Sequence, residues 1–123
     1  MPKKSLESLE LALRDYAAEY PEVTEDHPWG HRAMKVRGKV FVFLGGEQKN
    51  GKELSLSVKL PQSRDMAVDL LFAEPTGYGM GKHGWVSARF TKVNEVPLEL
   101  LKKWIDESFR AIAPKKLVKT LDE

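Results

Sequence analysis

The stretch LSLSVKL, residues 54–60, alternates strictly between apolar and polar side chains. Because successive side chains of a β-strand point to opposite faces of a sheet, this period predicts a strand with one buried side and one wet side. The predicted buried set is Leu54, Leu56, Val58 and Leu60, and the wet set is Ser55, Ser57 and Lys59. Such one-sided strands are typical of antiparallel sheets that a second layer covers on one face only.

Neighbouring strands are predicted on both sides of this segment. In AMKVRGKVFVFLGG, Arg32 to Val36 reads as one strand, Arg37-Gly38 as a tight turn and KVFVFL as a second strand, whose apolar run suggests burial on both faces. GGEQKNGKE then reads as a flexible connection. Further on, WVSARF, residues 85–90, is predicted to be a strand because of its aromatic and β-branched content.

Three helices are predicted to supply the covering layer. The first is capped by Ser5 and runs to about Glu19, with an apolar stripe of Leu6, Leu9, Leu13, Tyr16 and Ala17. The second runs from Pro61 to about Ala73, with Ser63 as a cap and a buried stripe of Met66, Leu70 and Leu71. The third is capped by Asn94, has Pro97 in its first turn and buries Leu98, Leu101, Ile105, Phe109 and Ile112.

The remaining segments read as connections. PEVTEDHPWGH, residues 21–31, is predicted to be an acidic loop. Residues 114–123 are predicted to be a loose basic tail, with a further helical turn as the alternative. At 123 residues the chain is expected to form one domain, residues 1–123. The order of elements is helix, three strands, helix, one or two strands, helix. This order predicts an α+β fold with an antiparallel sheet packed against helices.

The glycines in GMGKHGWV, residues 79–86, match a G-x-G-x-x-G nucleotide-binding pattern. A dinucleotide site needs a strand before this pattern and a helix after it, whereas here a strand follows. A kinase site needs catalytic motifs that the chain lacks. The glycines are therefore interpreted as allowing a sharp turn or a close backbone approach before Trp85.

Composition limits the remaining classes of function. The chain has no cysteine, which excludes disulfides and thiolate chemistry and fits a cytoplasmic location. No apolar run is long enough for a membrane span, and residues 1–10, MPKKSLESLE, lack the apolar segment expected of a signal peptide. The net charge of +2 is unevenly placed: residues 1–30 carry three basic and seven acidic side chains, residues 31–60 seven basic and two acidic. A local basic patch is possible for this reason.

Catalytic and metal-binding patterns are weak. Glu25, Asp26, His27 and His31 cluster, but Pro28 and Gly30 prevent a helix that would present both histidines on one face, so a solvated acidic loop is favoured and no metal is predicted. His83 is an isolated base without a nucleophile or an orienting acid. We predict no catalytic residues and no cofactor, and a protein that binds rather than an enzyme.

Cations and hydroxyls on the wet sheet face suit contacts with phosphate. The predicted nucleic-acid-binding residues are Lys35, Arg37, Lys39, Lys59, Lys82 and Arg89. The alternative is a module for a small ligand or a protein partner, with a cleft at Lys82, His83 and Trp85. An ordinary polar sheet face would carry a similar set of residues.

Several segments together resemble the MmcQ/YjbR-like family of small bacterial proteins, over about Leu9 to Lys116. They are YPEVTEDHPWGHRAMKVRGKVFVFL, LSLSVKL, GYGMGKHGWV and WIDESF, and the most specific positions are Lys39 after Gly38, Lys59, Lys82 with Trp85, and Ser108-Phe109. The resemblance implies an α-β-β-β-α-β-β-α domain with an extra strand in TGYGM. Members are commonly labelled DNA-binding because of a "double wing"-like architecture, so DNA is an expected partner, and the family supplies no catalytic residues.

Overall fold

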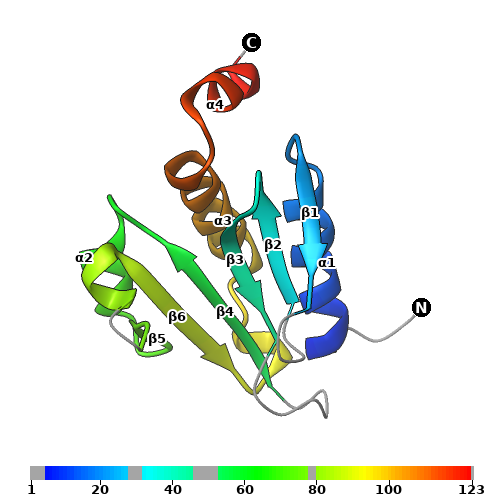
Figure 1. The fold of residues 1–123 in the computed structure, drawn as a ribbon. Coiled ribbons are helices and arrows are strands. Elements are labelled where there is room, and N and C mark those ends of the chain that lie inside the picture. Colours follow the sequence, from blue (N-terminus) through cyan, green and yellow to red (C-terminus); the bar gives the residue numbers. More distant parts are fainter. Residues whose placement is uncertain (1–4, 28–31, 46–52, 78–79, 123) are drawn as a thin grey trace.

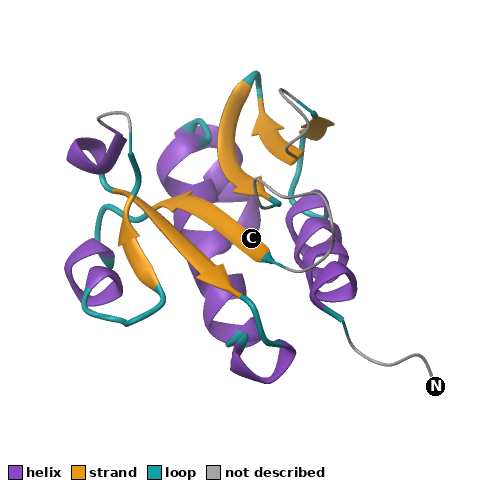
Figure 2. Ribbon diagram, turned by 90° about the horizontal axis from the view of Figure 1, so that it is seen from below, coloured by secondary structure: helices purple, strands orange, loops and turns teal. Residues whose placement is uncertain are grey.

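The computed structural model describes residues 5–27, 32–45, 53–77 and 80–122. In these residues, six strands form one antiparallel sheet in the order β1-β2-β3-β4-β6-β5 (Figure 1). Their bounds are β1 Val23–Asp26, β2 Arg32–Val36, β3 Lys39–Leu44, β4 Leu54–Lys59, β5 Ala73–Pro75 and β6 Trp85–Phe90. Seen from below, the strands fan out and the sheet is visibly twisted (Figure 2). The predicted α+β fold is confirmed.

The alternation in residues 54–60 has the predicted consequence. Leu54, Leu56 and Val58 of β4 are buried, while the side chains between them are partly exposed. Across the ladder these three residues face Phe90, Ala88 and Val86 of β6, which are buried as well. The buried residues of β4 and β6 therefore form one apolar face of the sheet, because paired residues of antiparallel strands point to the same side.

Two long helices cover this apolar face. They are α1 (Leu6–Ala18) and α3 (Leu98–Ile112), which lie behind the sheet in Figure 1. Ser5 caps α1 as predicted, and its hydroxyl accepts a hydrogen bond from the Ser8 amide at 3.0 Å while the Ser8 hydroxyl accepts one from the Ser5 amide at 2.8 Å. The buried faces of the two helices are Leu6, Leu9, Leu13 and Ala17 in α1, and Leu101, Trp104, Ile105, Ser108 and Phe109 in α3. No described helix is long and apolar enough to cross a membrane.

A β-bulge in β3 places one of its residues in contact with α3. The pairing shifts from Met34–Val42 to Lys35–Val40, which leaves Phe41 as an extra residue in β3. The ring of Phe41 packs against Phe109 of α3, with ring centroids 5.2 Å apart. KVFVFL is therefore not buried on both faces throughout: Phe41, Val42 and Leu44 are buried, but Val40 and Phe43 keep partial exposure.

Two of the segments predicted to be connections contain regular elements, one of which, a helical turn in the tail, the sequence left open. Residues 23–26 of the predicted acidic loop form the edge strand β1, which pairs with β2; residues 28–31 of that loop lie outside the described residues. The predicted loose tail contains α4 (Lys115–Leu121), in which Leu117 is buried. In both cases contacts with distant residues stabilise a short element that has little intrinsic preference for it.

The second predicted helix is wrong in length and in the face it buries. The structure has a five-residue helix, α2 (Arg64–Val68), whose buried residue is Ala67. Met66, Leu70 and Leu71, predicted to be buried, are exposed. Ser63 makes no capping bond within α2, and its hydroxyl donates instead to Glu107 Oε1 of α3 at 2.6 Å. The helix ends early because β5 must begin at Ala73 to pair with β6.

Two boundaries also differ from the prediction. The strand expected in TGYGM is β5, which lies earlier, at Ala73–Pro75; Tyr78 and Gly79 are outside the described residues. The N-cap of α3 is Pro97 rather than Asn94, because Asn94 belongs to a short 3-10 helix, η3 (Val93–Glu95), that turns the chain before α3.

Candidate nucleic-acid interface

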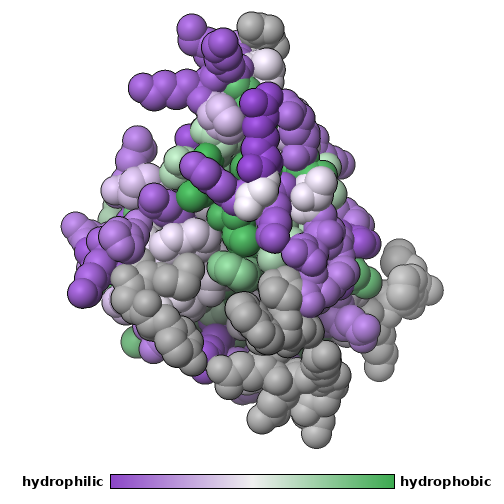
Figure 3. Space-filling view, in the orientation of Figure 1, coloured by the Kyte–Doolittle hydropathy of each residue, from purple (hydrophilic) through white to green (hydrophobic). Residues whose placement is uncertain are grey.

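The sheet face opposite α1 and α3 is called the outer face here. Its side chains follow from the registers: Ser55, Ser57 and Lys59 of β4 pair with Arg89, Ser87 and Trp85 of β6. Phe43 of β3 pairs with Ser57, which places it on the same face. Lys35 of β2 lies on this face too, because its neighbours Met34 and Val36 are buried against the helices. In Figure 3, hydrophobic residues gather near the middle of this face, with hydrophilic residues around them.

An aromatic pair and a chain of hydroxyls occupy the centre of the outer face. The rings of Phe43 and Trp85 lie 5.9 Å apart, and Trp85 is only 9% exposed. The Ser87 hydroxyl is 2.7 Å from that of Ser57 and 2.9 Å from that of Thr76. The prediction of burial on both faces missed Phe43, because Val42, Phe43 and Leu44 are all apolar and the sequence carries no alternation there.

Five of the six predicted cations lie at one end of the sheet, and Arg89 lies toward the other end. Lys59 ends β4 opposite Trp85, and Lys39 begins β3 at the same end. Lys82 is in the 3-10 helix η2 (Met80–His83), directly before Trp85. Arg89 lies four residues further along β6, about 13 Å away along the strand. Lys35 and Arg37 lie toward the β1 edge, Lys35 within β2 and Arg37 in the β2–β3 turn.

Acidic side chains pair with Lys35, Arg37 and Arg89. Lys35 Nζ donates to Asp26 Oδ2 at 2.9 Å, and Arg37 binds both carboxylate oxygens of Glu22, at 2.9 and 3.1 Å. The hydrogen bond from Lys35 holds the pKa of Asp26 below its usual value, and that from Arg37 does the same to the pKa of Glu22. Arg89 Nε lies 3.8 Å from Glu53 Oε1. A phosphate would have to compete with these carboxylates.

Three predicted cations stand apart from this pairing. Lys39, Lys59 and Lys82 make no ion pair with any residue in the described part of the chain. All three lie at the end of the sheet where β3 begins and β4 ends, and we call this group the lysine end. Lys39 and Lys82 are exposed and Lys59 is partly exposed. Three of the six predicted cations therefore lie together, and no carboxylate in the described part of the chain pairs with them.

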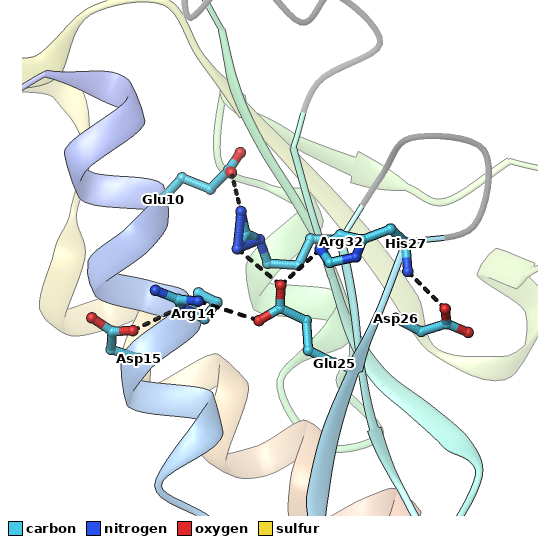
Figure 4. Close-up of polar contacts among 7 residues, drawn as sticks. All are labelled: Glu10, Arg14, Asp15, Glu25, Asp26, His27 and Arg32. Carbon is cyan, nitrogen blue, oxygen red and sulfur yellow. Dashed lines mark hydrogen bonds and ion pairs between the residues drawn. The ribbon is translucent and has the colours of Figure 1, made fainter.

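Glu25, the first acidic residue of the cluster at 25–31, binds two arginines. Figure 4 shows Glu25 of β1 between Arg32 of β2, at 3.3 Å, and Arg14 of α1, at 3.4 Å, with His27 Nε2 at 2.7 Å. Partial burial raises the pKa of Glu25, but Arg32 and the hydrogen bonds from His27 and Arg14 together hold it below its usual value. Arg32 also lies 3.7 Å from Glu10 of α1. This network ties the edge strand β1 to α1; His31 is outside the described residues.

Two of the three glycines before Trp85 shape the backbone, as interpreted from the sequence, while Gly79 lies outside the described residues. Gly84 has a φ of 87°, in the left-handed region that favours glycine. A Cβ at Gly81 would lie 2.9 Å from the Cβ of Pro75, closer than real side chains approach. The strand β6 follows this turn, where a dinucleotide site would need a helix.

The alternative cleft at Lys82, His83 and Trp85 stays a prediction. Lys82 and His83 are exposed, whereas Trp85 packs onto Phe43 and is nearly buried. Three surface hollows are lined by described residues elsewhere: two beside Phe72 and Arg89, and one between Pro61 and Arg110. Nothing in this geometry favours the cleft over the lysine end.

Comparisons with known proteins agree with the fold. The family model described as YjbR matches residues 18–111, which is most of the chain. The chain belongs to the YjbR family. A search of curated proteins finds no match for this YjbR-family chain. Among solved structures, the crystal structure of Deinococcus radiodurans protein DR2400, which carries the family-model domain DUF419, superposes with a TM-score of 0.69 at 22% identity, covering 99% of this chain and 91% of that one. That likeness shows a shared fold.

Proposed function

We propose that this YjbR-family protein binds DNA without sequence preference, through the lysine end of the sheet. The observation that supports the proposal most is the segregation of charge: Lys39, Lys59 and Lys82 have no acidic partner among the described residues, whereas Lys35, Arg37 and Arg89 do. Ammonium groups of this kind supply the sequence-independent part of nucleic-acid affinity, because each phosphate contact releases counterions from the polymer.

The surroundings of the three lysines fit the same ligand. The hydroxyls of Ser57, Ser87 and Thr76 lie on the same sheet face and can donate to phosphate or sugar oxygens. Glu22 and Asp26 line the β1 edge and would repel phosphate there. The DNA backbone is therefore expected to approach from the Lys59 side of the sheet and to avoid the β1 edge.

The proposal makes a quantitative prediction about salt. With three phosphate contacts, the association constant for duplex DNA should fall roughly 40-fold between about 50 and about 200 mM salt. Fluorescence anisotropy with random duplex and random single-stranded DNA at both salt concentrations measures this. In the triple variant Lys39→Glu/Lys59→Glu/Lys82→Glu, binding should be lost at both concentrations, while circular dichroism shows that the variant folds.

A matched control separates this site from net charge. Lys103→Glu/Lys115→Glu/Lys116→Glu makes the same change in charge on the exposed surfaces of α3 and α4. It should weaken binding far less than the first triple variant, because only long-range attraction is reduced. No binding by the wild type at the lower salt concentration, or equal losses in the two triple variants, would remove the lysine end as a DNA site.

A further inference from the structure

A patch of exposed apolar side chains lies beside α2, on a surface separate from the lysine end. Of the four large hydrophobic residues exposed in the described part of the chain, three fall within six positions: Met66 at 78% exposure, Leu70 at 37% and Leu71 at 106%. Leu71 thus projects fully into solvent. Contiguous exposed apolar side chains of this kind are unusual on a monomer and mark interaction surfaces.

Leu71 lies at the rim of two adjoining hollows. One, of about 310 Å³, is lined by Leu71, Phe72, Ala73, Glu74, Ser87 and Arg89. The other, of about 530 Å³, shares Leu71, Phe72 and Arg89 and adds Phe90, Thr91 and Glu95. The ring of Phe72 packs against Phe90, at 4.9 Å, and against Trp104 of α3, at 6.1 Å. The apolar wall is therefore anchored in the core and holds its shape, next to an apolar side chain that could fill such a hollow.

The charges around the hollows are balanced in a way that suits a copy of the same surface. Each hollow carries the cation Arg89 and one carboxylate, Glu74 in the first and Glu95 in the second. Arg89 is 58% exposed and its contact with Glu53 of the same chain is long, at 3.8 Å, so its guanidinium can bind a second carboxylate. A strongly acidic or strongly basic partner would meet one like charge in either hollow. Two copies related by a two-fold axis instead place Arg89 of each against a carboxylate of the other, and Leu71 of each against the hollow of the other.

Extension of the sheet is a poor way to use this edge. The strand β5 has only three residues, Ala73–Pro75, and Pro75 has no amide hydrogen to donate to an added strand. Association here must depend on side chains. We propose that the chain forms a two-fold symmetric dimer in which Leu71 of each copy enters the hollow beside Phe72 and Arg89 of its partner. This interface goes beyond the proposed DNA contact and borders the outer face at Arg89.

Sedimentation velocity over protein concentrations from about 1 µM to about 500 µM, the range of weak association, tests the dimer. The weight-average mass of the wild type should rise toward twice the chain mass of 14.0 kDa. Leu71→Asp should remain monomeric at all concentrations with unchanged thermal unfolding, because the side chain is fully exposed. Leu11→Gln, at the exposed apolar residue on α1, is the matched control and should dimerise like the wild type.

Charge reversal gives a second, independent readout. Glu74→Arg and Arg89→Glu should each prevent self-association, because like charges then meet across the two-fold axis. An equimolar mixture of the two variants should associate, because both cross-pairs are again of opposite sign.

A wild type that stays monomeric at the highest concentration overturns the proposal and leaves the face to a partner of another kind. A dimer that Leu71→Asp does not weaken overturns it as well. DNA binding by Leu71→Asp should equal that of the wild type, so the two proposals can fail separately.

Discussion

The turn between β2 and β3 depends on two residues with left-handed backbone conformations. Arg37 has a φ of 50° and Gly38 a φ of 82°, the combination that closes a tight hairpin whose twist matches its strands. Arg37 also binds Glu22, which itself has a φ of 59°. Two strained residues from separate turns therefore hold each other through a bidentate ion pair. The sequence predicted the turn from Arg37-Gly38, but it did not indicate this partner.

Gly38→Ala should reduce the free energy of unfolding by about 1–2 kcal/mol, the cost of a left-handed conformation for a residue with a Cβ. The cost should come from the backbone alone, because a Cβ at this position would meet no atom within 4 Å. Urea unfolding of the wild type and the variant measures the difference.

Gly77→Ala is the matched control for this substitution. Its Cβ would also meet nothing within 4 Å, but its φ is not in the left-handed region. This variant should be neutral or slightly more stable than the wild type, because alanine restricts the unfolded chain. Equal losses in the two alanine variants would show that φ is not the cause.

The contact between α3 and the sheet depends on a buried hydroxyl. Ser108 is 0% exposed; its hydroxyl donates to the Phe41 carbonyl of β3 and accepts from the Lys59 amide of β4 at 2.9 Å. The register break at Phe41 removes that residue from the ladder, and a helix side chain supplies the missing partner. Ser108-Phe109 was singled out in the sequence as a specific position of the family, and this bridge gives it a physical role.

Ser108→Ala should lower the free energy of unfolding by about 3 kcal/mol, because it leaves a buried carbonyl and a buried amide without partners. Chemical denaturation measures the loss. Ser57→Ala removes a hydroxyl that is partly exposed and bonds only to another hydroxyl, so it should cost less than about 1 kcal/mol. A small effect at Ser108 would mean that water or backbone movement satisfies the two groups.

The helices that flank the sheet show where periodic patterns mislead. Long amphipathic patterns were interpreted correctly: Leu9 and Leu13 of α1 and Leu101 and Ile105 of α3 are buried as predicted. The apolar residues of 61–73 were interpreted wrongly, since Leu71 is exposed. The tail of 114–123, predicted to be loose, holds a helix in which Leu117 is buried. Short segments have too few turns for their periodicity to decide, so packing against residues far away in the sequence sets their burial.

In the folded chain, the acidic segment 1–30 and the basic segment 31–60 meet along one edge of the sheet. Pairing of β1 with β2 places the acidic residues Glu22, Glu25 and Asp26 beside the basic residues Arg32, Lys35 and Arg37. The basic segment 31–60, which supplies four of the six predicted cations, is therefore neutralised along the edge beside β1. What remains positive is the lysine end, which the order of the strands creates.

The network around Glu25 should make stability depend on pH with a definite sign. Because the pKa of Glu25 is lower in the folded protein than its usual 4.5, its contribution is fully present above that value and is lost as the pH falls through the folded pKa. Glu25→Gln should thus lower the free energy of unfolding by about 1 kcal/mol at pH 7, as for a largely surface network. The difference from the wild type should shrink below about pH 4, measured by urea unfolding at several pH values.

Glu10 gives the comparison of opposite sign. Burial, only partly offset by Arg32, raises the pKa of Glu10 above its usual value, so the folded state holds this proton more tightly than the unfolded chain. The stability from this group is present at low pH and is lost as the pH rises through the folded pKa. Glu10→Gln should remove the loss of stability that ionisation of Glu10 causes as the pH rises.

A difference in the free energy of unfolding between the wild type and Glu25→Gln that stays constant from pH 7 to pH 3 would contradict the role given to the Glu25 carboxylate.

The sequence by itself determined which residues form the central strands, the two covering helices and the tight turn at Arg37-Gly38. These features depend on period, caps and local φ, all of which act within a few residues. Only the tertiary structure decided that residues 23–26 form an edge strand, that Leu71 faces solvent and that three of six cations are neutralised. The edge strand and the ion pairs depend on partners in other elements, and Leu71 is exposed because its neighbour Phe72 packs against the core. The free energy of such contacts exists only once strand order and register bring the groups together.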